Sequence, residues 1–108
     1  DICSCVLGKP DAGATVFMAL AVRAFNIPSS FTGSQAKAST SATASSVFTV
    51  YKNGSSIGTF TFAASGSTAT FSGAGGAVAA GDLLTIVAPG SQDATLANIA
   101  FTISGNLQ

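Results

Sequence analysis

The sequence predicts an all-β domain, an antiparallel β-sandwich of jelly-roll-like form with about seven to nine strands. Short runs rich in Val, Ile, Phe and Thr recur along the chain, as expected for strands. Turn-forming residues separate these runs at the spacing of a sandwich or jelly roll, and no segment has a convincing helical period. The 108 residues are the usual size of one domain, and no linker divides them. We therefore expect residues 1–108 to form a single domain.

The first half of the chain contains three predicted strands. Residues 2–7 form the first strand, and the Gly- and Pro-containing residues 8–13 form a turn. Residues 15–23 form a second, well-buried strand. Residues 26–30 interrupt the chain, because Pro28 cannot donate a hydrogen bond to a sheet. Residues 35–40 form a polar strand that is expected at the surface.

The second predicted strand is apolar on both of its faces. Phe17, Ala19 and Ala21 alternate with a second apolar row. This pattern predicts a strand at the centre of its sheet, or one whose second face lies against a partner subunit. The second row is the candidate protein-contact site, and its members are Val16, Met18, Leu20 and Val22.

The strongest local signal is a β-hairpin in the middle of the chain. Residues 47–52 and 57–62 are the two strands, and Asn53-Gly54 is the preferred dipeptide for a tight turn that needs positive φ at both positions. Tyr51 and Thr49 are expected on the face opposite the core. The core-facing residues of the hairpin are predicted to be Phe48, Val50, Phe60 and Phe62.

Three further strands are predicted in the last third of the chain. They are residues 68–72, residues 83–88 and residues 96–104. Residues 73–81, which are mostly Gly and Ala, are predicted to be a loop between the first two of these strands. The Gly-rich start of this loop lacks the Lys-Ser or Lys-Thr of a phosphate-binding loop, so no nucleotide cofactor is expected.

The residues that carry most enzyme chemistry are absent or isolated. The chain has no histidine, so neither a Ser–His nor a Cys–His pair can form, and no catalytic residue is predicted. Asp11, Asp82 and Asp93 each occur in a turn sequence, where the carboxylate is expected to accept hydrogen bonds from nearby backbone N–H groups. A calcium site built from Asp82, Asp93 and Asn98 is a weaker alternative, because the spacing matches no calcium-loop pattern.

Cys3 and Cys5 are the two cysteines of the chain. With no histidine and no further cysteine they are too few for a zinc site. They are predicted to be small core-facing residues, as in a protein assembled in a reducing compartment. A bridge between two chains is the alternative.

Low charge excludes several classes of partner. Charged residues make up 7% of the chain and the net charge is zero. No basic run could neutralise several phosphates, so nucleic-acid binding is not expected. The longest apolar stretch, residues 16–22, is too short to span a bilayer, so membrane insertion is not expected. A neutral surface favours self-association.

Three segments carry a resemblance to a known family. They are VRAFNIPSSFTGSQAKASTSATASSVFTVYKNGSSIGTFTFA at residues 22–63, AAGDLLTIVAP at residues 79–89 and DATLANIAFTISG at residues 93–105. In their order and spacing they resemble a β-rich domain of virion proteins from tailed bacteriophages and prophages, including tail and tail-fibre proteins. Such domains typically form a terminal portion of a longer protein. The chain has no initial Met and no basic leader, so it is expected to be processed or to be a piece of a longer protein.

The resemblance implies a non-enzymatic part of a phage particle: a tail, fibre or head-decoration protein, assembled in the cytoplasm of the bacterial host. Its expected partners are other virion proteins and copies of itself. The alternative is a module at a fibre tip that binds a host receptor or a glycan through loops at one end of the sandwich. Residues 73–81 and 91–94 are the loops expected to do so.

Overall fold

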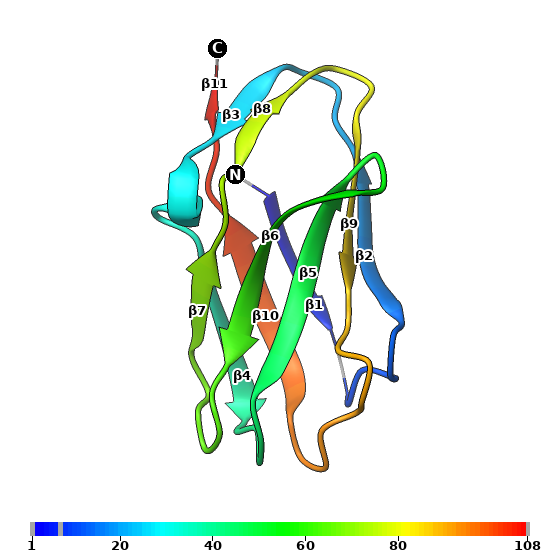
Figure 1. Cartoon of the computed structure of the whole chain (residues 1–108), viewed down its shortest axis with the longest axis vertical. Helices are drawn as coiled ribbons and strands as arrows, with labels where there is room; N and C mark the ends of the chain where they lie inside the picture. The colour runs from blue at the N-terminus through cyan, green and yellow to red at the C-terminus, as the bar shows by residue number, and fades with distance from the viewer. Residues whose placement is uncertain (1, 7, 108) are drawn as a thin grey trace.

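The computed structural model describes residues 2–6 and 8–107, and these residues form an all-β, sandwich-like fold, as predicted (Figure 1). The strands make three antiparallel sheets. A single 3-10 turn, η1, covers Ser29–Phe31 in the described residues. The strands are β1 (Ile2–Val6), β2 (Thr15–Leu20), β3 (Phe25–Ile27), β4 (Gln35–Thr40), β5 (Ser46–Lys52), β6 (Ser55–Phe62), β7 (Ala69–Ser72), β8 (Gly76–Val78), β9 (Leu83–Val87), β10 (Ala97–Ile103) and β11 (Asn106–Leu107).

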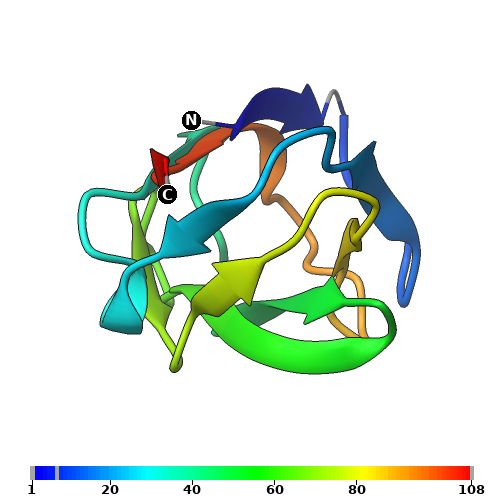
Figure 2. The ribbon, with the colours of Figure 1, turned by 90° about the horizontal axis from the view of Figure 1, so that it is seen from above.

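Two of the sheets face each other across the core. One has three strands in the order β1-β10-β4, and the other has five in the order β2-β9-β5-β6-β7. The third sheet, β11-β3-β8, lies at one end of the sandwich (Figures 1 and 2). Aromatic contacts join the two large sheets, because Phe101 of β10 packs against Phe17 of β2 and Phe60 of β6, with ring centroids 5.2 and 6.0 Å apart. The core therefore holds the two large sheets together.

The pairing of the strands is nested. β1 pairs with β10, β2 with β9, β3 with β8 and β5 with β6. A bridge between Lys37 and Thr68 brings β4 beside the start of β7. Such nesting is expected of a jelly roll, in which a long hairpin wraps on itself. The nesting is incomplete, because β7 pairs along its length with β6 and not with β4. The jelly-roll form therefore stays a prediction.

The central hairpin forms as predicted. Lys52 of β5 pairs with Ser55 of β6, and the two turn residues between them, Asn53 and Gly54, have φ values of 52° and 86°. The residues predicted to face the core from this hairpin are buried: Phe48, Val50, Phe60 and Phe62. Positive φ at both turn positions is what the Asn-Gly dipeptide supplies at low cost.

Two short strands occupy segments predicted to lack them. β3 lies partly in the predicted break at residues 26–30, and β8 lies inside the predicted loop at residues 73–81. The two strands pair with each other, with Phe25 opposite Val78. The β8 segment is mostly Gly and Ala, which have low strand propensity, and β3 runs directly into Pro28. In both segments the prediction was wrong because pairing with a partner distant in sequence overrides the local signal.

The second strand is not central. β2 covers Thr15–Leu20 rather than residues 15–23, and it is the outermost strand of the five-stranded sheet. It ends where Ala21 bonds to the turn before β9, accepting from the N–H of Gly81 at 2.7 Å and donating to the carbonyl of Asp82 at 2.9 Å. Two apolar faces therefore do not mean two buried faces in this strand.

Cys5 is exposed, so its predicted place in the core is wrong. In the register of β1 and β10, Ser4 lies opposite the buried Phe101 and Cys5 lies opposite the exposed Ala100. Because side chains alternate along a strand, Cys5 points to the outer face. The side chain of Cys3 lies outside the described residues.

Candidate functional site

The outer face of β2 carries the most exposed large apolar side chains among the described residues. Met18 and Leu20 are each 63% exposed, and Val22, just after the strand, is 81% exposed. Val16, the fourth predicted contact residue, is half-buried and packs against the core beside an irregularity in the β2–β9 register. Three of the four predicted contact residues are therefore open to solvent. We call Met18, Leu20 and Val22 the β2 patch.

The same sheet carries one exposed apolar side chain that the sequence analysis did not assign to a contact surface. Val47 of β5 is 42% exposed. Its neighbour Phe48 is buried, so alternation along the strand places Val47 on the outer face. The pattern that identified Phe48 as a core residue could have identified Val47 as its outward neighbour.

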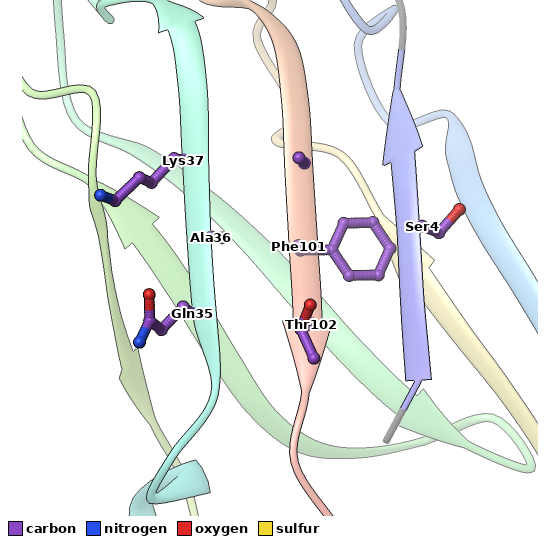
Figure 3. Close-up of a pocket in the computed structure, with 7 residues that line it drawn as sticks. Ser4, Gln35, Ala36, Lys37, Phe101 and Thr102 are labelled. Carbon is purple, nitrogen blue, oxygen red and sulfur yellow. The ribbon is translucent and has the colours of Figure 1, made fainter.

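The outer side of the three-stranded sheet has an open hollow of about 280 Å³ (Figure 3). Lys37 and Gln35 extend from β4, and Thr102 lies on β10 between β4 and β1 (Figure 3). The lining has one charged side chain and no acid or histidine. It is made by Ser4, Gln35, Ala36, Lys37, Ala100, Phe101 and Thr102. The hollow therefore offers hydrogen-bonding groups without a paired acid and base.

Asp93 ties together two loops at one end of the sandwich. Its carboxylate accepts hydrogen bonds from the N–H groups of Thr43 and Ala44, at 3.0–3.1 Å, in the loop between β4 and β5. It also accepts from the N–H groups of Thr95 and Leu96, at 3.0 and 2.9 Å, in its own loop. These bonds hold the pKa of Asp93 well below its ordinary value, the bond from Thr43 having the largest effect. The carboxylate is thus committed to the fold, as its turn sequence predicted.

Asp82 has a similar role at the other end. It accepts a hydrogen bond from the N–H of Ala79 at 2.8 Å and one from the side-chain amide of Asn53 at 3.0 Å. The bond from Ala79, followed by that from Asn53, lowers the pKa of Asp82. Asn53 also accepts from the N–H of Leu83 at 2.9 Å. The network joins the central hairpin to the turn before β9.

The alternative calcium site does not form. Asp82 precedes β9 and Asp93 follows it, so the two carboxylates lie at opposite ends of that strand. The Asn98 side chain instead accepts a hydrogen bond from the N–H of Gly8 at 2.8 Å. Within residues 2–6 and 8–107, no three His, Cys, Asp or Glu side chains gather into a group that could hold a metal ion.

The two loops predicted for receptor or glycan binding do not lie together. Residues 73–81 contain β8, at the end of the sandwich with the third sheet, and residues 91–94 lie in the β9–β10 loop at the opposite end (Figure 1). The expectation that they share one end was wrong because the chain from β8 through β9 to the β9–β10 loop passes from one end of the sandwich to the other (Figure 1). A single ligand-binding surface cannot be built from both.

Replacing Asp93 with Asn is expected to lower the melting temperature at pH 7. One of the two oxygens becomes an NH₂ group, which would face backbone N–H donors instead of accepting from them. Because folding lowers the pKa of Asp93, its stabilisation is present above the ordinary value near 4 and is lost as pH falls toward the lower, folded-state pKa. The gap between wild type and Asp93→Asn should therefore narrow below about pH 4. Thermal melts between pH 7 and pH 2 would measure it, with Asp11→Asn as control, and a gap independent of pH would contradict the assignment.

Comparison with known protein families, curated proteins and solved structures finds no match to this chain. No helix in the described part of the chain is long and apolar enough to cross a membrane. The candidate site therefore depends on the geometry of the β2 patch and on the residues around it.

Proposed function

We propose that this domain is a non-enzymatic structural component of a tailed-bacteriophage particle that acts through protein–protein contacts. The proposal depends mainly on the β2 patch, in which Met18, Leu20 and Val22 leave apolar side chains open to solvent on an outermost strand. Exposed apolar residues grouped in this way mark interaction surfaces more often than scattered single residues do. The partners are other virion proteins and copies of the domain itself.

The distribution of charge supports a contact role. The chain has four basic and four acidic residues, and residues 12–22, which include β2 and its patch, contain none of them. Two of the four acids, Asp82 and Asp93, are engaged in the hydrogen bonds that hold loops together. An apolar, uncharged strand edge can be covered by another protein without burying an unpaired charge.

The sequence resemblance supplies the biological setting. The segments at residues 22–63, 79–89 and 93–105 resemble phage tail and tail-fibre domains in their order and spacing, and they include β3 to β6, β9 and β10. A virion location, with assembly in the cytoplasm of the bacterial host, follows from this resemblance as part of the proposal. The proposed mechanism is burial of the β2 patch against a neighbouring subunit.

Leu20→Asp is expected to fold like the wild type and to be incorporated poorly into particles. Leu20 is 63% exposed, so the folded domain tolerates the charge, whereas an interface would bury the charge unpaired. Circular dichroism would check folding, and mass spectrometry of purified particles would measure the amount incorporated. Thr70→Asp, on the exposed side of β7 at the opposite edge of the same sheet, is the matched control. Absence of the wild-type chain from particles would contradict the proposal, as would normal incorporation of Leu20→Asp.

A further inference from the structure

The outer edge of β2 has no neighbouring strand among the described residues. β2 pairs only with β9 in its sheet. The other outermost strand of that sheet, β7, is partly covered by β4. Lys37 of β4 forms an antiparallel β-bridge with Thr68, just before β7, and the N–H of Ala38 donates to the carbonyl of Ser67 at 2.8 Å. The β2 edge is thus the open edge of the five-stranded sheet.

The hydrogen bonds of β9 and Ala21 reveal which β2 residues direct their backbone groups outward. In β9, the carbonyl of Leu83 points toward β5 and accepts a hydrogen bond from the N–H of Asn53. Successive residues of a strand direct their backbone groups to opposite sides, so the N–H and C=O of Leu84 point toward Ala19 of β2. Both backbone groups of Ala21 also bond toward β9. Alternation along an antiparallel strand therefore points the N–H and C=O groups of Met18 and Leu20 to the open edge.

Met18 and Leu20 can therefore contact a partner through both their backbone groups and their side chains. Met18 and Leu20 present free backbone groups at the edge and exposed apolar side chains on the adjoining outer face. Natural edge strands are usually protected by a charge, a proline or a bulge. The register irregularity of β2 lies between Thr15 and Phe17, so Phe17–Leu20 has none of these protections.

We propose that this edge pairs with the β2 edge of a second copy of the chain, in antiparallel orientation about a two-fold axis. The inference deepens the proposed function, and rests on it, by naming the occupant of the β2 patch. An antiparallel edge is complementary to itself under a two-fold rotation, which makes the interface the same on both copies. Net charge is zero and residues 12–22 carry no charge, so two copies meet without repulsion at this surface.

The geometry selects one register. If Ala19 lies opposite Ala19 of the second copy, Met18 lies opposite Leu20 on both sides of the axis, and both pairs exchange their N–H···O=C bonds. Shifting this register by two residues in either direction would use the irregular start of β2 or the segment beyond its end at Leu20. Only the Ala19-centred register keeps the bonds within the regular part of the strand.

The size of the contact sets the expected strength. Pairing of one short strand edge with its outer patch buries less than the roughly 800 Å² per partner of a standard stable interface. We therefore expect a reversible dimer with a dissociation constant in the micromolar range. In a particle, a high local concentration of the domain would favour the pairing.

Sedimentation equilibrium of the full chain over a range of concentrations tests the dimer. Leu20→Asp replaces an apolar partner of Met18 on both sides of the axis and adds two like charges, so it should weaken the association by about tenfold or more. Thr70→Asp, at the other edge of the sheet, should leave the association unchanged. A wild type that remains monomeric at every concentration would overturn the proposal, as would a Leu20→Asp variant that associates as tightly as the wild type.

A cysteine at position 19 tests the register. In a chain that also carries Cys3→Ser and Cys5→Ser, Ala19→Cys should form a covalent dimer when oxidised glutathione is added. Opposed residues of a non-hydrogen-bonded pair have Cα atoms about 4.5 Å apart, which is within disulfide range. Ala100→Cys in the same background, exposed on the other large sheet, should not form one efficiently. Equal cross-linking at both positions, or none at position 19, would overturn the proposed register.

The experiments can contradict the dimer without contradicting the proposed function, and the reverse. A monomeric wild type whose Leu20→Asp variant is excluded from particles would mean that a different virion protein covers the β2 patch, which overturns the dimer and keeps the function. A chain that dimerises through position 19 but is absent from particles would keep the dimer and overturn the function. The two experiments therefore test each proposal separately.

Discussion

Phe60→Ala is expected to destabilise the domain by about 3–5 kcal/mol, because truncating a buried aromatic side chain removes its packing and leaves a cavity. Phe60 is 1% exposed and lies at the centre of the aromatic cluster. Its ring stacks on Phe48 with centroids 5.0 Å apart and contacts Phe71 at 5.1 Å. It also reaches Phe101 of the opposite sheet, at 6.0 Å. The substitution therefore weakens packing within one sheet and contact between the two.

The expected loss is large compared with the stability of a small domain, which is usually about 5–15 kcal/mol. Urea unfolding followed by circular dichroism would measure it, with the free energy of unfolding extrapolated to water. Val47→Ala is the matched control, since Val47 belongs to the same hairpin but is 42% exposed, and its loss should be much smaller. A Phe60→Ala loss no larger than that of the control would mean that the cluster does not hold the sheets together.

The sequence predicts best the parts of this fold that depend on neighbouring residues. The hairpin was predictable because Asn53 and Gly54 both favour positive φ and because Phe60 and Phe62 alternate with threonines. β4 has the bounds predicted for it, Gln35–Thr40. In each case the signal and the structure lie within the same short segment.

The parts that depend on distant partners were not predictable. β3 and β8 are three residues each and form because Phe25 and Val78, far apart in sequence, become paired. Nothing in a run of Gly and Ala indicates that partner. Asp82 and Asp93 likewise lie at opposite ends of the sandwich because β9 runs between them, and the sequence does not indicate the direction of that strand.

The candidate site lies between these two cases. Alternation correctly grouped Met18 and Leu20 on one face of β2, but an apolar face looks the same in sequence whether it meets the core, a partner or solvent. Only the strand order reveals that β2 is outermost and that the face is exposed. What covers the face is a property of the assembly, which is why it must be tested with the intact chain.

Gly73→Ala is expected to destabilise the domain strongly. Gly73 has a φ of 135°, a backbone conformation that residues with a side chain rarely adopt. An added Cβ would lie 2.7 Å from the carbonyl oxygen of Ile57 and nearer still to the Cα of Gly58. Both obstacles are backbone atoms of β6, so no side chain can rotate away, and relief requires the chain after β7 to move off the sheet.

Movement of that segment would affect the packing next to it. The carbonyl of Gly73 accepts a hydrogen bond from the N–H of Ser30 at 2.7 Å, and Ser30 precedes the buried Phe31, whose ring lies over Gly58. We therefore expect a loss of about 3 kcal/mol or more, the upper end of the usual cost of overpacking. Urea unfolding would measure the loss, with Gly90→Ala as the control, because a Cβ there meets nothing within 4 Å and φ is not positive. A Gly73→Ala variant as stable as Gly90→Ala would show that the segment after β7 does not lie against β6 as closely as described.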